Sequence, residues 1–281
     1  MVTTYRLSTI HHVVEIATTL ARSWFRGHSR VIGELTPRVF RPEFDDDMLR
    51  TFRPALELEM IESFKADAPA LAEGPTPPET DRLGWLYLMQ HYRAPTRLLD
   101  WTGNALMALY FVVSEDKKVD GELWALNPQA LNSAGEVGNA LPLIGANPVL
   151  NYLVEEPYWA GKPEDLAARC KMTVVPRSPA AFPPRRNFAR MIAQESVFTI
   201  HPRPQTGYTI PELLGSEKDL VRYIVPSKIK QELFHHLRAL GINDRTVFPD
   251  FDGLSKHVIA DSWTIAYSPP QPPTCDGPAY Q

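Results

Sequence analysis

Residues 90–102 place the strongest constraint on how this chain can fold. They read QHYRAPTRLLDWT and hold two arginines, a histidine, an aspartate and two threonines. The chain then enters residues 105–113, ALMALYFVV, which carry no charged side chain. Polar groups that are driven against a hydrophobic core must be paired, because an unpaired buried charge is costly. The fold must therefore supply partners for these arginines, either from the protein itself or from a ligand.

Apolar residues at helical or alternating spacing predict the elements around this stretch. Residues 105–113 are apolar on all sides, which predicts a buried helix or strand. Helices are expected over residues 8–22 with Ser8 as the cap, 46–66, 81–92, and 227–240 capped by Ser227 with Gly241 just past the end. Strands are expected over residues 24–27, 96–100, 121–126, 196–202 and 220–225.

The remaining segments are expected to be irregular. Residues 67–80 contain four prolines, and residues 127–186 are rich in proline, glycine and asparagine, so both are expected to form loops. Strands and helices are mixed without strict alternation. The sequence therefore favours an α+β fold over a doubly wound parallel sheet.

Composition excludes several classes of protein. The formal net charge of −4 and the pI of about 6.1 argue against a protein that coats nucleic acid. Cys170 and Cys275 lie outside any CxxC spacing, which argues against a zinc site and a disulfide scaffold. The chain has no signal-peptide pattern, no membrane-spanning apolar run, and no glycine-rich nucleotide loop of the Rossmann or P-loop type. We expect a cytoplasmic protein with no metal and no membrane partner.

Another arginine, Arg26, lies in an unusual setting, in the sequence Trp24-Phe25-Arg26-Gly27. In one interpretation Asp100 neutralises Arg26 or Arg97 in a buried ion pair that fastens a loop to the core. In the other, both arginines hold a phosphorylated ligand, because a guanidinium fork binds phosphate oxygens in a bidentate manner. The residues alone leave these two readings about equal.

Other side chains could complete such a ligand site. Gly27 would allow a close approach of the backbone to the ligand. Thr96 and Thr102 offer hydroxyl groups, and Tyr92 offers a ring face for stacking. Trp101 and Trp124 are expected to be core residues, and His91 is expected to be structural.

The arginine-containing motifs resemble the FRG domain, a family named for its Phe-Arg-Gly motif. The residues that carry this resemblance are Trp24 to Gly27, Leu35 to Arg41, Gln90 to Thr102, Asn104 to Phe111, Arg190 to Thr199 and Gly241 to Asp252. It extends from about residue 8 to residue 260. We therefore expect one FRG-type domain over residues 1–262, followed by a proline-rich, disordered tail over residues 263–281.

The FRG pattern looks like that of a remote relative of the ADP-ribosyltransferases. This resemblance implies a split mixed sheet with surrounding helices, NAD as substrate, and an unidentified macromolecular acceptor, protein or nucleic acid. It also suggests a toxin or a phage-defence effector. In this hypothesis Arg26 holds the diphosphate, Thr102 and Tyr92 shape the nicotinamide ribose pocket, and Asp100 orients Arg97.

The third motif of that family would fall at Gln194-Glu195-Ser196, where a glutamate orients the ribose 2′-hydroxyl. Neighbours on a strand face opposite ways, so only one of Gln194 and Glu195 points into the cleft. If it is Gln194, the carboxylate must come from elsewhere, for instance Asp100, or the protein is not a catalyst. Two alternatives therefore stay open: an NAD glycohydrolase, and a non-catalytic module that binds a nucleotide or nucleic acid.

Overall fold

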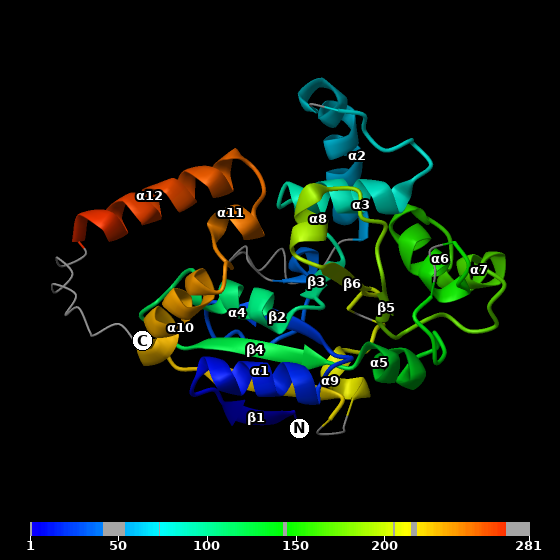
Figure 1. The fold of residues 1–281 in the computed structure, drawn as a ribbon. Coiled ribbons are helices and arrows are strands. Elements are labelled where there is room, and N and C mark those ends of the chain that lie inside the picture. The colour runs from blue at the N-terminus through cyan, green and yellow to red at the C-terminus, as the bar shows by residue number, and fades with distance from the viewer. Residues whose placement is uncertain are drawn as a thin grey trace, which may run out of the picture.

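The computed structural model describes residues 2–41, 54–72, 74–142, 145–204, 206–214 and 218–267. Its centre is one seven-stranded sheet in the order β1-β7-β4-β2-β3-β6-β5 (Figure 1). The strands are β1 (Thr3–Arg6), β2 (Trp24–His28), β3 (Leu98–Thr102), β4 (Gly121–Leu126), β5 (Ala180–Phe182), β6 (Ser196–Ile200) and β7 (Leu220–Val225). β1 and β7 run parallel, and every other neighbouring pair in this sheet is antiparallel. The sheet is therefore mixed, as the sequence predicts.

Helices surround this sheet. They are α1 (Ile10–Thr19), α2 (Pro54–Leu71), α3 (Arg82–His91), α4 (Ala105–Val113), α5 (Pro128–Ala134), α6 (Pro148–Glu155), α7 (Pro163–Arg169), α8 (Ala189–Ala193), α9 (Ile210–Leu213), α10 (Ser227–Ala239), α11 (Asp244–Val247) and α12 (Phe251–Tyr267), with short 3-10 turns η1 (Arg38–Phe40) and η2 (Glu156–Tyr158). Figure 1 shows α6 and α7 together at one end of the molecule and α12 extending away from the sheet.

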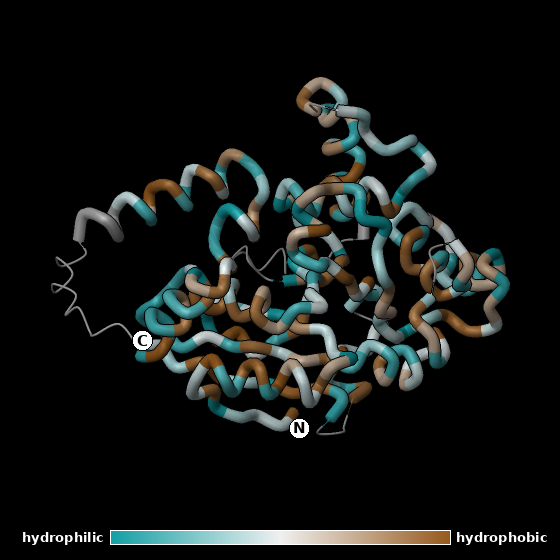
Figure 2. The backbone as a smooth tube through the Cα atoms, viewed as in Figure 1, coloured by the Kyte–Doolittle hydropathy of each residue, from teal (hydrophilic) through white to brown (hydrophobic). Residues whose placement is uncertain are grey.

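Helix α4 explains why residues 105–113 are apolar on all sides. It packs in one cluster with Phe25 of β2, Val13 of α1 and Leu233 of α10, so most of its surface is buried. Asn104 begins the helix by accepting hydrogen bonds from the amides of Leu106 and Met107 at 3.0 and 3.3 Å. Figure 2 shows α1 alternating between hydrophobic and hydrophilic residues, as expected of a helix with one face on this core.

Gly27 is required by the contact between β2 and α4. A Cβ atom at this position would lie 2.0 Å from the carbonyl oxygen of Ala108. The glycine therefore lets a strand approach a helix closely. Gly27 also lines the main cavity, so the expected close approach of its backbone to a ligand stays a prediction beside this packing role.

The tryptophans that were expected in the core are there. Trp101 and Trp124 are 3% and 2% exposed, and they form a cluster with Trp24. Leu131 of α5 and Ile210 of α9 belong to the same cluster. A separate cluster at the β5–β6 end joins those strands to α3, α6 and α7. These clusters join the central and β5-side strands to the helices, whereas the edge strand β1 is mostly exposed.

The sheet opens between β2 and β3. All five residues of β2 pair with β4, and all five residues of β3 pair with β6. β2 and β3 themselves pair only at Phe25 and Thr102. Beyond that pair the two strands diverge, which leaves Arg26 and Asp100 on the two sides of the opening. The sequence does not reveal this divergence, because each strand looks regular on its own.

Most central elements agree with the sequence-based expectations. The strands at 121–126 and 220–225 are confirmed, and residues 105–113 form a helix. Helix α2 extends to Leu71, with Pro69 in its last turn, so the expected loop over 67–80 starts too early. Thr9, and not Ser8, accepts the capping bond of α1, from the amide of His12 at 3.2 Å. Residues 46–53 and the tail from 268 lie outside the described residues.

The expectation of an irregular segment over residues 127–186 is wrong. This segment contains α5, α6, α7 and β5. Three of the prolines in this segment, Pro128, Pro148 and Pro163, occupy the first turns of helices, where the missing N–H costs nothing. Asn127 and Asn147 cap α5 and α6 by accepting backbone N–H groups. Proline and asparagine here begin short helices rather than interrupt the structure.

Candidate functional site

A cavity of about 400 Å³ lies at the opening between β2 and β3. Its polar wall comes from the strands and includes Arg26, Asp100 and Thr102. Its other wall is largely aromatic and includes His91 of α3 and Phe188, which lies just before α8. Their rings are stacked, with centroids 4.7 Å apart. The cavity therefore combines charged and aromatic side chains in its lining, a combination typical of ligand sites.

Arg26 lies at the edge of this cavity with only 14% of its side chain exposed. Its Nε donates to Nε2 of His28 at 2.9 Å, and its Nη1 donates to the carbonyl oxygen of Asp100 at 2.6 Å. Both acceptors are uncharged. The carboxylate of Asp100 is 3.9 Å from Nη1. Burial lowers the pKa of Arg26 to about 10, because the surroundings compensate the positive charge only in part.

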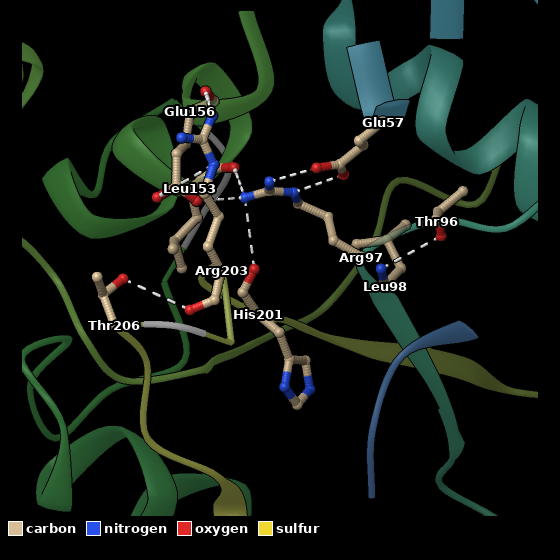
Figure 3. Close-up of polar contacts among 9 residues, drawn as sticks. All are labelled: Glu57, Thr96, Arg97, Leu98, Leu153, Glu156, His201, Arg203 and Thr206. Atoms are coloured by element: carbon tan, nitrogen blue, oxygen red, sulfur yellow. Dashed lines mark hydrogen bonds and ion pairs between the residues drawn. The ribbon is translucent and has the colours of Figure 1, made fainter. Parts of the chain in front are cut away.

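Arg97 is also buried, but its charge is fully matched. Its guanidinium is 0% exposed and donates to Glu57 at 2.7 and 2.5 Å and to Glu156 at 2.7 Å (Figure 3). It also donates to the carbonyl oxygens of Leu153 and His201. Burial alone would lower the pKa of Arg97, but the two carboxylates outweigh it and raise the pKa.

Arg97 is therefore a structural residue, and two expectations are corrected. It does not reach the cavity, so it holds no phosphate there. Asp100 does not orient it, because the alternation of side chains along a strand places residues three apart on opposite faces. The buried ion pair that was considered for this arginine exists, but its partners are Glu57 and Glu156.

Asp100 presents a carboxylate to the cavity. Half of its side chain is accessible, and it accepts a hydrogen bond from Nε2 of Gln90 at 2.5 Å. Burial among protein atoms raises the pKa of Asp100, and the charge of Arg26 opposes that shift. A carboxylate with a raised pKa beside a cationic group is a common feature of functional sites.

A second cavity of about 200 Å³ adjoins the first. The two share Arg26, Gln90, Arg93 and Asp100 in their walls. The smaller cavity adds two further arginines, from η1 and the residue after it. Burial is the largest cause that lowers the pKa of Arg26, and the charge of Asp100 opposes it. The positive charge of Arg41 lowers the pKa of Arg26 further. Cationic side chains therefore gather at this end of the site.

Gln194, and not Glu195, lines the main cavity. Gln194 ends α8, and its Nε2 donates to the carbonyl oxygen of Val247 at 3.1 Å. Glu195 has a φ of +47°, an unusual conformation for a residue other than glycine. Its carboxylate accepts from Nδ2 of Asn104 at 3.1 Å. The expectation that only one of the two faces the cavity is confirmed, but the cause is the turn between α8 and β6 and not alternation along a strand.

Of the two threonines that were expected at the site, only Thr102 lines the main cavity. Thr102 lines the main cavity, where its Oγ1 accepts from the amide of Asn104 at 3.0 Å. Thr96 is 1% exposed, and its hydroxyl donates to Gln90 at 2.5 Å. Thr96 thus reaches the site only through Gln90, and its expected direct contact with a ligand is not supported.

Tyr92 points away from the main cavity, contrary to expectation. It is 63% exposed and lines an apolar groove between α2 and α3. Its ring meets that of His91 edge to face, with centroids 4.9 Å apart. His91 provides the cavity wall that Tyr92 was expected to provide. No sequence pattern pointed to Phe188, since it lies nearly a hundred residues from His91 and outside any motif.

The residues that the structure describes contain neither a cluster of metal-ligand side chains nor a membrane-spanning helix. In those parts of the chain, no three or more histidine, cysteine, aspartate or glutamate side chains gather as metal ligands would. Within the same ranges, no helix combines the length and apolarity that crossing a membrane demands.

Comparison with known proteins gives one match. Residues 21–121 match the family model of the FRG domain. No curated protein and no solved structure matches the chain. The matched segment includes Arg26, Asp100 and Thr102, whereas Phe188 and Gln194 lie beyond it. The polar wall of the main cavity therefore comes mainly from the matched segment, and part of the aromatic wall comes from the rest of the chain.

Proposed function

We propose that this chain, whose residues 21–121 form an FRG domain, binds NAD in the main cavity and transfers the ADP-ribosyl group to a macromolecular acceptor. The observation that supports this most strongly is the state of Arg26. Its guanidinium is buried, and its acceptors at hydrogen-bonding distance are a neutral imidazole nitrogen and a backbone oxygen. A buried cation whose charge is compensated only in part is stabilised when an anion binds, and a diphosphate is such an anion.

The two adjoining cavities suit the two parts of a dinucleotide. In this proposal Arg26 contacts the diphosphate where the two cavities meet. The nicotinamide ring stacks in the main cavity against the aromatic surface that His91 and Phe188 form. The adenosine half extends toward the smaller cavity, where Arg93 forms part of the wall.

In this proposal Asp100, and not Glu195, supplies the carboxylate that the reaction needs. Cleavage breaks the bond between C1′ of the ribose and the nicotinamide nitrogen. The electron pair of that bond leaves with the nicotinamide ring. The sugar passes through an oxocarbenium-like state, which a nearby carboxylate stabilises. An acceptor nucleophile then bonds to C1′, and its proton passes to the carboxylate of Asp100. Gln194 is placed to hydrogen-bond a ribose hydroxyl from the opposite wall.

The test is an assay of nicotinamide release from NAD, labelled in the ADP-ribose part, in cell lysate. The variants are Arg26→Gln and, as a matched control, Arg30→Gln, since Arg30 is exposed and pairs with Asp116 at 2.8 Å. We expect release and labelled macromolecules with the wild type and with Arg30→Gln, and neither with Arg26→Gln. Thermal unfolding establishes that all three proteins are folded.

Other results would replace this proposal. Release of nicotinamide together with free ADP-ribose, and no labelled macromolecule, would identify an NAD glycohydrolase. Saturable binding of ADP-ribose without nicotinamide release would identify a non-catalytic binding module. Equal activity of the two variants would remove Arg26 from the mechanism.

A further inference from the structure

A chain of hydrogen bonds extends from Arg26 into the sheet. Nε of Arg26 donates to Nε2 of His28 at 2.9 Å. Nδ1 of the same ring lies 2.8 Å from Oε1 of Glu122. His28 is 8% exposed and Glu122 is 0% exposed, so water does not replace either contact. Arg26 and His28 share one face of β2 because they are two residues apart, and Glu122 is the direct cross-strand partner of His28 on β4.

The first of these bonds fixes the protonation of His28. An arginine Nε–H can only donate, so Nε2 of His28 must carry no proton. The single ring proton then lies on Nδ1 and is donated to Glu122. A protonated ring would turn a second N–H toward the guanidinium and break the contact. The geometry therefore requires neutral His28 with its proton on Nδ1.

Glu122 is held as a carboxylate at the end of this chain. It accepts the amides of Ile32 and Gly33 at 3.2 Å, and Nη1 of Arg222 is 3.9 Å away. Burial by itself would raise the pKa of Glu122, but hydrogen bonds that include those from His28 and the amide of Gly33 outweigh it and lower the pKa. An acceptor that stays ionised keeps the proton of His28 on Nδ1.

We propose that His28 is a positioning residue that fixes Arg26 in its anion-binding orientation by accepting its Nε–H, with Glu122 as the group that sets the ring tautomer. The inference rests on the proposed function, in which Arg26 contacts the diphosphate. With Nε bound to His28 and Nη1 bound to the backbone of Asp100, the guanidinium plane is fixed before a ligand arrives. Such preorganisation strengthens binding because less conformational freedom is lost.

The first test observes the tautomer directly in the wild-type protein. Long-range ¹H–¹⁵N NMR spectra at pH 7.5 distinguish a protonated from a bare ring nitrogen, and exposed His11 provides a reference signal within the chain. We expect Nδ1–H and a bare Nε2 for His28, and loss of this pattern in Glu122→Leu. A signal for Nε2–H or for a doubly protonated ring in the wild type would overturn the inference.

The second test measures the dissociation constant of inorganic pyrophosphate by calorimetry. His28→Leu removes the acceptor, whereas His28→Gln retains an oxygen acceptor and an amide donor. We expect the dissociation constant to rise about tenfold or more in His28→Leu, as for the loss of a hydrogen bond to a charged group, and to be largely restored in His28→Gln. His11→Leu, at an exposed position, is the control and should bind as the wild type does.

The outcomes separate this inference from the proposed reaction. His28-dependent pyrophosphate binding supports the inference even if NAD is not cleaved, in which case only the catalytic proposal fails. Equal binding by wild type and His28→Leu overturns it, and so does a wild-type protein that binds no pyrophosphate. If His28→Leu does not fold, the wild-type tautomer and His28→Gln still decide the question.

Discussion

The two buried arginines should respond in opposite ways when their charge is removed. Arg97→Gln leaves Glu57 and Glu156 without their common partner, although both are almost completely buried. Breaking a buried ion pair from one side typically costs about 3–5 kcal/mol. Arg26→Gln instead removes a cation that the folded protein compensates only in part. We therefore expect Arg97→Gln to destabilise the protein strongly and Arg26→Gln to leave it equally or more stable.

The pKa of Arg26 gives the size of this effect. Folding lowers that pKa from 12.5 to about 10. Each unit corresponds to about 1.4 kcal/mol, so the charged form is disfavoured in the folded state by about 3 kcal/mol. This is an upper value, because the variant also loses hydrogen bonds to His28 and to the backbone of Asp100. We expect Arg26→Gln to raise the free energy of unfolding by about 1 kcal/mol, within the span that these opposing contributions allow.

Denaturant unfolding and thermal melting measure both variants. For a chain of this size, 1 kcal/mol corresponds to about 2–4 °C. Arg97→Gln should therefore melt roughly 6–20 °C below the wild type. Arg26→Gln should melt at or slightly above the wild-type temperature while losing pyrophosphate binding. A loss of stability in Arg26→Gln comparable to that in Arg97→Gln would refute the reasoning, since Arg26 would then be a structural ion-pair residue.

Three further predictions follow from the geometry. Gly27→Ala should lower the free energy of unfolding by about 3 kcal/mol in denaturant titrations, because the new methyl group meets the carbonyl of Ala108; wild-type stability would show that β2 can move away from α4. Burial lowers the pKa of His28 to about 4 and that of His201 to about 3, so the unfolded chain binds more protons below pH 6.5 and stability should fall as pH decreases from 6.5 toward 4; a flat profile from unfolding at pH 7, 6 and 5 contradicts this. Asp100→Asn should abolish nicotinamide release yet tighten pyrophosphate binding, because it removes the negative charge beside the guanidinium; unchanged release in the same assay would exclude this carboxylate from the reaction.

The agreement between sequence and structure is best where a pattern is local. The short apolar segments at 121–126 and 220–225 identify strands, and the apolar run at 105–113 identifies a buried segment. The asparagine-capped helices α5 and α6 were missed because proline was read as a break in structure. In both helices proline occupies the first turn, which a reader of the sequence can recognise when an asparagine precedes it.

The direction of site residues could not be predicted with the same success. Alternation along a strand predicts that only one of Gln194 and Glu195 faces the cavity, and it leaves open which one. The structure selects Gln194 through a turn with a left-handed φ at Glu195. Tyr92 was chosen for its ring, but the end of α3 turns it outward and leaves His91 facing the cavity. These outcomes depend on the backbone path between elements, which periodicity does not describe.

The order of residues alone shows that two arginines, in strand-like segments beside a buried core element, need negatively charged or polar partners. It also contains the FRG motifs that the family comparison matches over residues 21–121. Which arginine is satisfied within the protein follows from the packing of the folded chain. Arg97 finds its carboxylates 40 and 59 residues away, on α2 and at the start of η2, whereas Arg26 meets neutral acceptors at an opening in the sheet. Charge pairing at such separations is set by how helices and strands pack, and a local pattern of residues carries no record of it.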